Sequence, residues 1–237
     1  MLRRAIAVLM CFGILAPAVA TAQAPAAQAK APATQPKAAP AADRWEAEIA
    51  KFEAADKTTP PPKDAVLFVG SSSIRLWDLK KSFPDVAAIN RGFGGSQMSD
   101  AARHARRLIN VYKPRLIVLY EGDNDLQSKR TPEQVAADFD TLLKTVRADL
   151  PTTPMLVIGC KPSPSRWTLI EQQRATNRLL AERCTKDGHA QLLDWEKSLL
   201  GTDGQPRPEL FRPDRLHLNE DGYKIWNDLL KPHLAAK

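Results

Sequence analysis

Three consecutive serines, Ser71 to Ser73, follow the apolar run "AVLFVG" at residues 65–70. Serine is an ordinary turn and helix N-cap residue, so on its own this run predicts only a turn. A serine can also attack an acyl carbon if a base removes its proton and N–H donors stabilise the resulting oxyanion. A serine nucleophile here therefore requires such a base and such donors elsewhere in the chain.

The best candidate for the base is His217. The segment "PDRLH" places Asp214 three residues before it, in a turn where the carboxylate can fold back on the imidazole ring. A carboxylate on one ring nitrogen leaves the other nitrogen free to accept the serine proton. The other histidines, His104, His189 and His233, lie at positions typical of the surface or of packing.

Two further segments can supply oxyanion donors. "GFGGS" (92–96) contains glycines, whose lack of Cβ lets a backbone N–H come close to a substrate, and "GDND" (122–125) contains the neutral amide of Asn124. In isolation the first segment is typical of a flexible turn. The second is typical of a polar loop, or of a cation site built from Asp123 and Asp125.

The elements that must position these residues alternate between strands and helices. Apolar runs that predict buried strands occupy residues 65–70, 86–90, 115–120, 154–159 and 190–195, with helical patterns between them. This alternation predicts a parallel sheet with helices on both faces, in which ligands bind at the carboxyl ends of the strands. The serines, the glycines and Asn124 follow the first three strands, so they should meet at one edge of the sheet.

The order of these motifs resembles that of the SGNH (GDSL-type) hydrolases, including the platelet-activating-factor acetylhydrolase-like branch. Gly-x-Ser follows the first strand, Gly the second, Gly-x-Asn the third, and Asp-x-x-His precedes the last helix. The resemblance covers residues 64–237. It implies an α/β fold, a three-layer α/β/α sandwich with a five-stranded parallel sheet of the flavodoxin-like kind.

The resemblance also implies a role for each candidate residue. Ser72 would be the nucleophile, His217 the general base and Asp214 its orienting carboxylate. The oxyanion hole would consist of the backbone N–H groups of Ser72 and Gly95 and the side-chain amide of Asn124.

One position departs from the family pattern. Ser71 stands where the family has the Asp of Gly-Asp-Ser. That Asp is not a triad member, so catalysis is expected to survive, with a different hydrogen bond in the loop. Ser73 is expected to open the following helix.

The sequence predicts an exported protein. Arg3 and Arg4, an apolar stretch and small residues predict a signal peptide over residues 1–22, and the Ala/Pro-rich residues 23–42 read as a disordered linker. The hydrolase domain is expected at 43–237, opened by a short amphipathic helix over 43–56, with a periplasmic or secreted location.

Net charge and cysteine spacing bear on nucleic-acid binding and on disulfide pairing. Four of the seven net positive charges lie in residues 1–42, so the basic balance is weak support for nucleic-acid binding. Cys160 and Cys184 are expected to be unpaired, because the predicted helix between them separates them beyond disulfide reach. No cofactor, no metal and no stable membrane insertion are expected, and the oligomeric state stays open.

The predicted activity is hydrolysis of short-chain acyl esters, acetyl esters above all, of a small molecule or a carbohydrate. Two alternatives are a metal-dependent phosphoesterase using Asp123, Asp125, Asp214 and His217, and a non-catalytic glycan-binding protein with the same fold. The alcohol part of the substrate stays open, because the candidates for the pocket mouth can equally be core tryptophans and solvated cations; they are Arg75, Trp77, Lys161, Arg166 and Trp167.

Overall fold

The computed structural model describes residues 43–234 of the chain. The predicted signal peptide (1–22) and linker (23–42) lie outside the described residues. The strands are β1 (Val66–Gly70), β2 (Ala88–Gly92), β3 (Leu116–Tyr120), β4 (Met155–Ile158) and β5 (Ala190–Leu193).

These strands form one parallel sheet in the order β2-β1-β3-β4-β5. Gly70, the last residue of β1, is level with Gly92 in β2 and with Tyr120 in β3. The loops after these three strands therefore leave the sheet at the same edge. The chain also reverses its direction of travel across the sheet at β1, and such switch points are where parallel sheets bind ligands.

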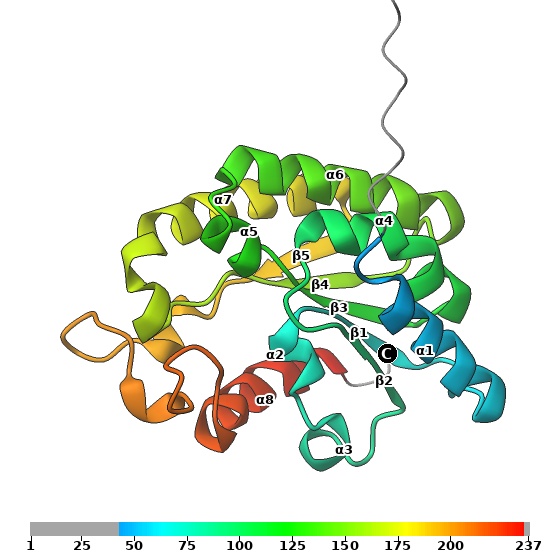
Figure 1. Cartoon of the computed structure of the whole chain (residues 1–237), viewed down its shortest axis with the longest axis horizontal. Coiled ribbons are helices and arrows are strands. Elements are labelled where there is room, and N and C mark those ends of the chain that lie inside the picture. Colours follow the sequence, from blue (N-terminus) through cyan, green and yellow to red (C-terminus); the bar gives the residue numbers. More distant parts are fainter. Residues whose placement is uncertain (1–42, 235–237) are drawn as a thin grey trace, which may run out of the picture. The chain divides into compact units, whose positions relative to one another are not determined.

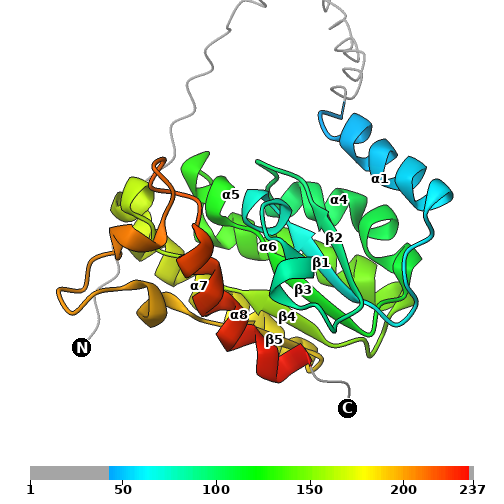
Figure 2. The ribbon, with the colours of Figure 1, turned by 90° about the horizontal axis from the view of Figure 1, so that it is seen from below.

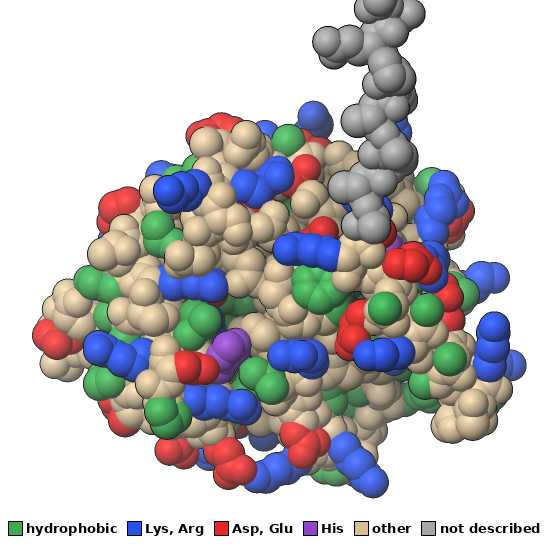
Figure 3. Space-filling model, in the orientation of Figure 1, with side chains coloured by type: hydrophobic (Ala, Val, Ile, Leu, Met, Phe, Trp, Pro, Cys, Tyr) green, Lys and Arg blue, Asp and Glu red, His purple; other side chains and the backbone are tan. Residues whose placement is uncertain are grey.

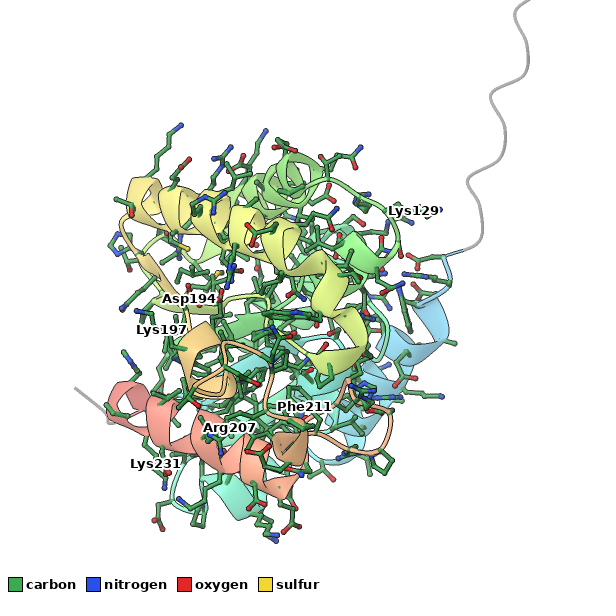
Figure 4. The ribbon with its side chains drawn as sticks, turned by 90° about the vertical axis from the view of Figure 1, so that its left-hand side faces the viewer. Lys129, Asp194, Lys197, Arg207, Phe211 and Lys231 are labelled. Carbon is green, nitrogen blue, oxygen red and sulfur yellow. The ribbon has the colours of Figure 1, made fainter. Side chains whose placement is uncertain are left out.

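Helices cover both faces of the sheet, as predicted. They are α1 (Glu46–Thr58), α2 (Ser72–Arg75), α3 (Leu79–Ser82), α4 (Met98–Leu108), α5 (Asp123–Gln127), α6 (Pro132–Asp149), α7 (Ile170–Asp187) and α8 (Glu220–Leu234). Helices α4, α6 and α7 lie on one face, with α1 against α4, and α8 lies on the other (Figures 1 and 2). In Figure 4, α7 and α8 are seen on opposite sides of the strands, and Phe211 lies in the segment that connects β5 to α8. The three-layer α/β/α fold is thus confirmed.

Local sequence sets the helix boundaries where a capping side chain is present. At the start of α6, Thr131 Oγ1 accepts a hydrogen bond from the Gln134 N–H (3.3 Å), and Gln134 Oε1 accepts one from the Thr131 N–H (3.0 Å). Pro132 follows at the first helical position, where its missing N–H costs nothing. At the start of α8, Asn219 Oδ1 accepts a hydrogen bond from the Gly222 N–H (3.0 Å).

Some predicted boundaries were wrong. The first helix begins at Glu46 and not at 43, because Asp43 closes a turn on the Trp45 N–H (3.0 Å) and faces His104 (3.0 Å). The sequence pattern after the second strand predicts a helix over 98–111, whereas α4 ends at Leu108 and a short 3-10 turn, Asn110–Tyr112, follows.

The expected start of α2 at Ser73 was also wrong by one residue. The Ser71 N–H still donates to the Tyr120 carbonyl of β3 (3.2 Å), so Ser71 belongs to the edge of the sheet. Helix α2 therefore begins at Ser72.

The core explains one of the residues whose position the sequence left open. Trp77 is 2% exposed and packs against Phe68, Tyr223 and Trp226 between the sheet and α8. It is a core residue and does not line a pocket. Cys160 and Cys184 are both buried and free, as predicted. None of the described helices is long and apolar enough to cross a membrane.

Candidate active site

The end of β1 exposes one of the three serines. Gly70 has φ +145°, and a Cβ there would lie 2.1 Å from the Tyr120 carbonyl oxygen, so only glycine fits against β3. Beyond it, Ser71 and Ser73 are buried at 2% and 3% exposure, whereas Ser72 is only half-buried. Among these three hydroxyls, that of Ser72 is the one a substrate can reach.

His217 connects Ser72 to Asp214. Its Nε2 lies 2.8 Å from Ser72 Oγ, across 145 residues of sequence, and its Nδ1 lies 2.6 Å from Asp214 Oδ2. With Asp214 ionised, the proton of a neutral ring resides on Nδ1, and Nε2 accepts the Ser72 hydroxyl. The structure therefore brings the three residues into one hydrogen-bonded chain.

A tight turn holds Asp214 in place. Its Oδ1 accepts the backbone N–H groups of Leu216 (2.9 Å) and His217 (3.0 Å), and Arg215 adopts φ +57°, an uncommon conformation for a residue with a Cβ. Desolvation works to raise the pKa of Asp214, but the hydrogen bonds from the His217 ring and from these N–H groups outweigh it and lower the pKa to about 2. Asp214 is thus a carboxylate at neutral pH.

The loop after β2 presents Gly95. This residue is exposed and has φ +89°, and a Cβ there would meet only Trp45, at 3.8 Å. Backbone conformation, not crowding, therefore favours glycine at this position. Among the described residues, the N–H groups of Gly95 and Ser72 have no hydrogen-bond acceptor, so both can serve a substrate.

Asn124 lies near the start of α5, and both ends of its amide are held. Its Nδ2 donates to the Ser96 carbonyl in the loop after β2 (2.9 Å), and its Oδ1 accepts from Arg166 Nη2 (3.0 Å). The amide nitrogen carries two hydrogens, so one of them stays available after the bond to Ser96. The two predicted donors are thus connected, because Asn124 binds the carbonyl of Ser96, the residue that follows Gly95.

Two buried acids, Glu121 and Asp125, form hydrogen bonds with the loop after β2 and with the start of α4. The Ser96 hydroxyl donates to the carboxyl of Glu121, and burial raises the pKa of Glu121 well above its usual range. Asp125 accepts from the Met98 N–H at the start of α4 (3.1 Å), and burial raises its pKa to about 6 despite that bond. Sequence reasoning missed these contacts.

Asp123 is enclosed by polar side chains. It accepts hydrogen bonds from Tyr120 (2.8 Å), Gln173 (2.9 Å) and Lys161 (3.2 Å), and Arg166 Nη1 lies 3.5 Å from it. Burial works to raise its pKa, but the charges of Lys161 and Arg166 prevail and lower it. Lys161 is therefore a buried ion-pair partner and neither a solvated cation nor a pocket-mouth residue.

This enclosure argues against the metal-dependent alternative. The Asp123 carboxylate is already satisfied by cationic and neutral donors, and Asp125 binds a backbone N–H and faces Arg130 (3.6 Å). Within the described part of the chain, the only group with metal-ligand spacing is Asp43, Glu46 and His104, beside α1 and α4. None of these is a residue of the predicted phosphoesterase site.

The comparison with family models shows which family the chain belongs to. A model of the GDSL-like lipase/acylhydrolase family matches residues 75–225, more than half of the chain. The chain belongs to this family. Membership confirms both the resemblance found in the sequence and the predicted enzyme class, a hydrolase that acts on ester bonds. Because the match begins at Arg75, the assignment of Ser72 depends on the geometry described above and on the motif order.

The chain is also similar to a curated relative in sequence and to two solved structures in fold. The platelet-activating factor acetylhydrolase IB subunit alpha2 of Homo sapiens is 30% identical over 193 residues, with 76% of this chain and 79% of that protein covered. A Streptococcus pneumonia structure described as a platelet activating factor has a TM-score of 0.72 at 20% identity, with 80% and 92% of the two chains covered. An acetylxylan esterase of Geobacillus stearothermophilus has a TM-score of 0.60 at 12% identity, with 73% and 95% covered.

Proposed function

We propose that this family member is an exported serine esterase that hydrolyses short-chain acyl esters, acetyl esters above all, through an acyl-enzyme on Ser72. The observation that carries the proposal is the chain of hydrogen bonds from Ser72 through His217 to Asp214, at 2.8 Å and 2.6 Å. A half-buried hydroxyl, a ring nitrogen and an ionised carboxylate in this order are the parts that a serine nucleophile needs.

In the first step, Ser72 Oγ attacks the acyl carbon while its proton moves to His217 Nε2. The carbonyl oxygen becomes an oxyanion and receives hydrogen bonds from the Ser72 N–H, the Gly95 N–H and Asn124 Nδ2. The bond between the acyl carbon and the alcohol oxygen then breaks. His217 gives its proton to the leaving alcohol, and the acyl group stays on Ser72.

In the second step, water replaces the alcohol. His217 Nε2 takes a proton from the water, whose oxygen attacks the acyl carbon of the acyl-enzyme. The same donors hold the second oxyanion. When the bond to Ser72 Oγ breaks, the proton returns to Oγ, the carboxylic acid leaves, and the site is restored.

The names of the relatives support an acetyl ester as substrate. One relative is called an acetylhydrolase and one structural neighbour an acetylxylan esterase. The sequence also lacks a long apolar insertion between the strands that could cover a long acyl chain. Activity should therefore fall steadily along a series of nitrophenyl esters from acetate to decanoate, and a preference for decanoate would contradict the acetyl assignment.

The serine assignment is tested by three matched variants. Ser72→Ala should abolish hydrolysis of nitrophenyl acetate, because no nucleophile remains. Ser71→Ala and Ser73→Ala should retain activity within about tenfold, because these buried hydroxyls do not reach the substrate. Full activity of Ser72→Ala, with intact folding by circular dichroism, would contradict the proposal.

Export is supported by the basic and apolar start of the chain, with Arg3 and Arg4 before the apolar stretch. Expression in a Gram-negative host should release a shortened protein into the periplasm or medium. Retention of the full-length chain in the cytosol would contradict it.

A further inference from the structure

The side-chain amide of Asn124 can serve an oxyanion only in one of its two orientations. Rotation of the amide by half a turn exchanges the donating Nδ2 for the accepting Oδ1, which would repel an oxyanion. The two orientations have the same shape, so hydrogen-bond partners decide between them. The question is therefore which partners hold this amide.

Arg166 holds the oxygen end. Its Nη2 donates to Asn124 Oδ1 at 3.0 Å, while Nη1 of the same guanidinium lies 3.5 Å from Asp123 Oδ2. The Ser96 carbonyl holds the other end of the amide at 2.9 Å. A guanidinium has no acceptor atom and a carbonyl has no donor, so Arg166 and Ser96 together select the orientation in which Nδ2 donates.

Asp123 and Lys161 fix the guanidinium. The Asp123 side chain is 4% exposed, that of Lys161 3% and that of Arg166 11%, so the three charges are largely removed from water. One carboxylate pairs with two cations, so this cluster of three side chains carries a net charge of +1 next to Asn124. In a poorly solvated site, such a charge favours negative charge on a nearby oxygen.

The backbone beside Arg166 also forms a hydrogen bond to the turn that contains Asp214 and His217. Arg166 lies in the 3-10 segment η2 (Pro164–Leu169) after β4, at a kink with φ −121° and ψ 22°. The N–H of the preceding Ser165 donates to the Arg215 carbonyl (3.0 Å), between Asp214 and His217. The segment thus connects the turn that holds the base with the residue that holds the amide.

We propose that Arg166, fixed by Asp123 and Lys161, is a positioning residue that orients the Asn124 amide toward the oxyanion and places a positive charge behind it. This inference rests on the proposed function, because it takes Asn124 as an oxyanion donor. Arg166 acts through Asn124 and not through a contact of its own with the substrate.

The kinetic test is a double-mutant cycle on nitrophenyl acetate. Arg166→Gln should lower kcat about 10- to 100-fold, with KM changed less than about threefold. The upper end of this range corresponds to the complete loss of one oxyanion donor. In the Asn124→Ala background the same change should cost less than about threefold. If the two losses multiply instead, Arg166 acts independently of Asn124 and the proposal is wrong.

Two variants serve as comparisons in this cycle. Arg166→Lys keeps a charge beside Asp123, but a single ammonium cannot replace a guanidinium that spans two residues, so its activity should lie between wild type and Arg166→Gln. Arg174→Gln is the matched control, since Arg174 on α7 pairs with Glu196 (2.6 Å) and contacts no residue of the site. Its kcat should equal that of wild type.

A second test does not depend on turnover. The side-chain NH₂ signals of Asn124, assigned in NMR spectra by their loss in Asn124→Ala, should be sharp and well separated in the wild type. In Arg166→Gln these signals should broaden or converge, because Asn124 Oδ1 loses its hydrogen bond from the guanidinium. If that variant does not fold, the same signals are measured in Arg166→Lys. Unchanged signals would overturn the positioning role, whereas a wild type without esterase activity would overturn the proposed function.

Discussion

The two nitrogens of His217 have different partners, and this division determines how Ser72 can react. Nδ1 faces a carboxylate whose pKa is about 2, so Asp214 stays ionised at neutral pH and keeps the ring proton on Nδ1. Nε2 is then the acceptor for the Ser72 proton at 2.8 Å. The direction of proton transfer is therefore set by the carboxylate behind the ring.

Replacement of Asp214 by Asn should change which nitrogen of the His217 ring carries the proton, while it preserves the size of the side chain at position 214. Its amide can donate to Nδ1, which favours the proton on Nε2 and removes the acceptor for Ser72. We expect kcat for nitrophenyl acetate to fall by about 10³–10⁴, with little change in KM. Asp221→Asn, at an exposed acid in the first turn of α8, is the control and should behave as wild type. A loss below tenfold in Asp214→Asn would contradict the assigned role.

Sequence reasoning succeeded for the residues whose type carries the chemistry and failed for those whose role comes from burial. Ser72, Asp214 and His217 were predicted together, and the structure brings them together, although their catalytic roles stay predictions. Lys161 and Arg166 could not be placed, because their contacts with Asp123 and Asn124 depend on how the segment after β4 bends back. An Asp between Gly122 and Asn124 was the available signal, since a buried carboxylate requires a cationic or hydrogen-bonding partner.

At the scale of elements, the loop after β2 is held between α1, α4 and α5. The ring of Trp45, just before α1, packs edge-on against Phe93 at 5.4 Å, and Arg44 reaches the Gly95 carbonyl at 3.5 Å. From the other side, Asp125 of α5 accepts the Met98 N–H at the start of α4. Gly95 therefore lies in a loop that neighbouring elements fix on both sides.

The burial of Asp125 has a measurable cost in stability at neutral pH. Burial raises the pKa of Asp125 from 3.8 to about 6, so between these values the folded state binds a proton that the unfolded state releases. Its contribution to stability is therefore fully present below pH 4 and is lost as pH rises through 6. Burial also raises the pKa of Glu121, which therefore acts in the same direction.

Asp125→Asn should accordingly flatten the dependence of stability on pH. Urea unfolding of the wild type at pH 5 and pH 7 includes the part of this loss that falls between the two pH values, about 1.3 kcal/mol for a folded-state pKa of about 6. In Asp125→Asn the difference between the two pH values should shrink by about that amount. Asp140→Asn, an exposed acid on α6, should leave it unchanged. An unaltered pH dependence in Asp125→Asn would show that Asp125 does not titrate as described.

At the scale of the whole molecule, the alternation of strands and helices was enough to predict the architecture. Five apolar runs predicted the five parallel strands, and the side chains of Thr131 and Asn219 cap the helices that follow them. Helix ends and the start of α1 could not be predicted from the sequence, because tertiary contacts such as that of Asp43 with His104 decide them. Acidic and basic side chains are interspersed on the face in Figure 3, in keeping with a modest net charge for the domain.

The predicted domain boundary is also open to a direct test. All the site contacts described above lie within residues 43–234, so a protein of residues 43–237 should fold and hydrolyse nitrophenyl acetate with the kcat/KM of the longer chain. Activity and thermal unfolding of the two proteins, purified in parallel, check this. A tenfold lower kcat/KM in the shorter protein would show that residues before 43 contribute to the site.

The central claim, that Ser72 is the nucleophile activated by His217, is tested most directly by covalent labelling with a serine-reactive phosphonate. Peptide mass spectrometry of the labelled wild type should locate the adduct on Ser72 alone. Labelling should disappear in Ser72→Ala and become at least about 100-fold slower in His217→Ala, which lacks the base. An adduct on Ser71 or Ser73, or an active esterase that takes up no phosphonate, would contradict the account.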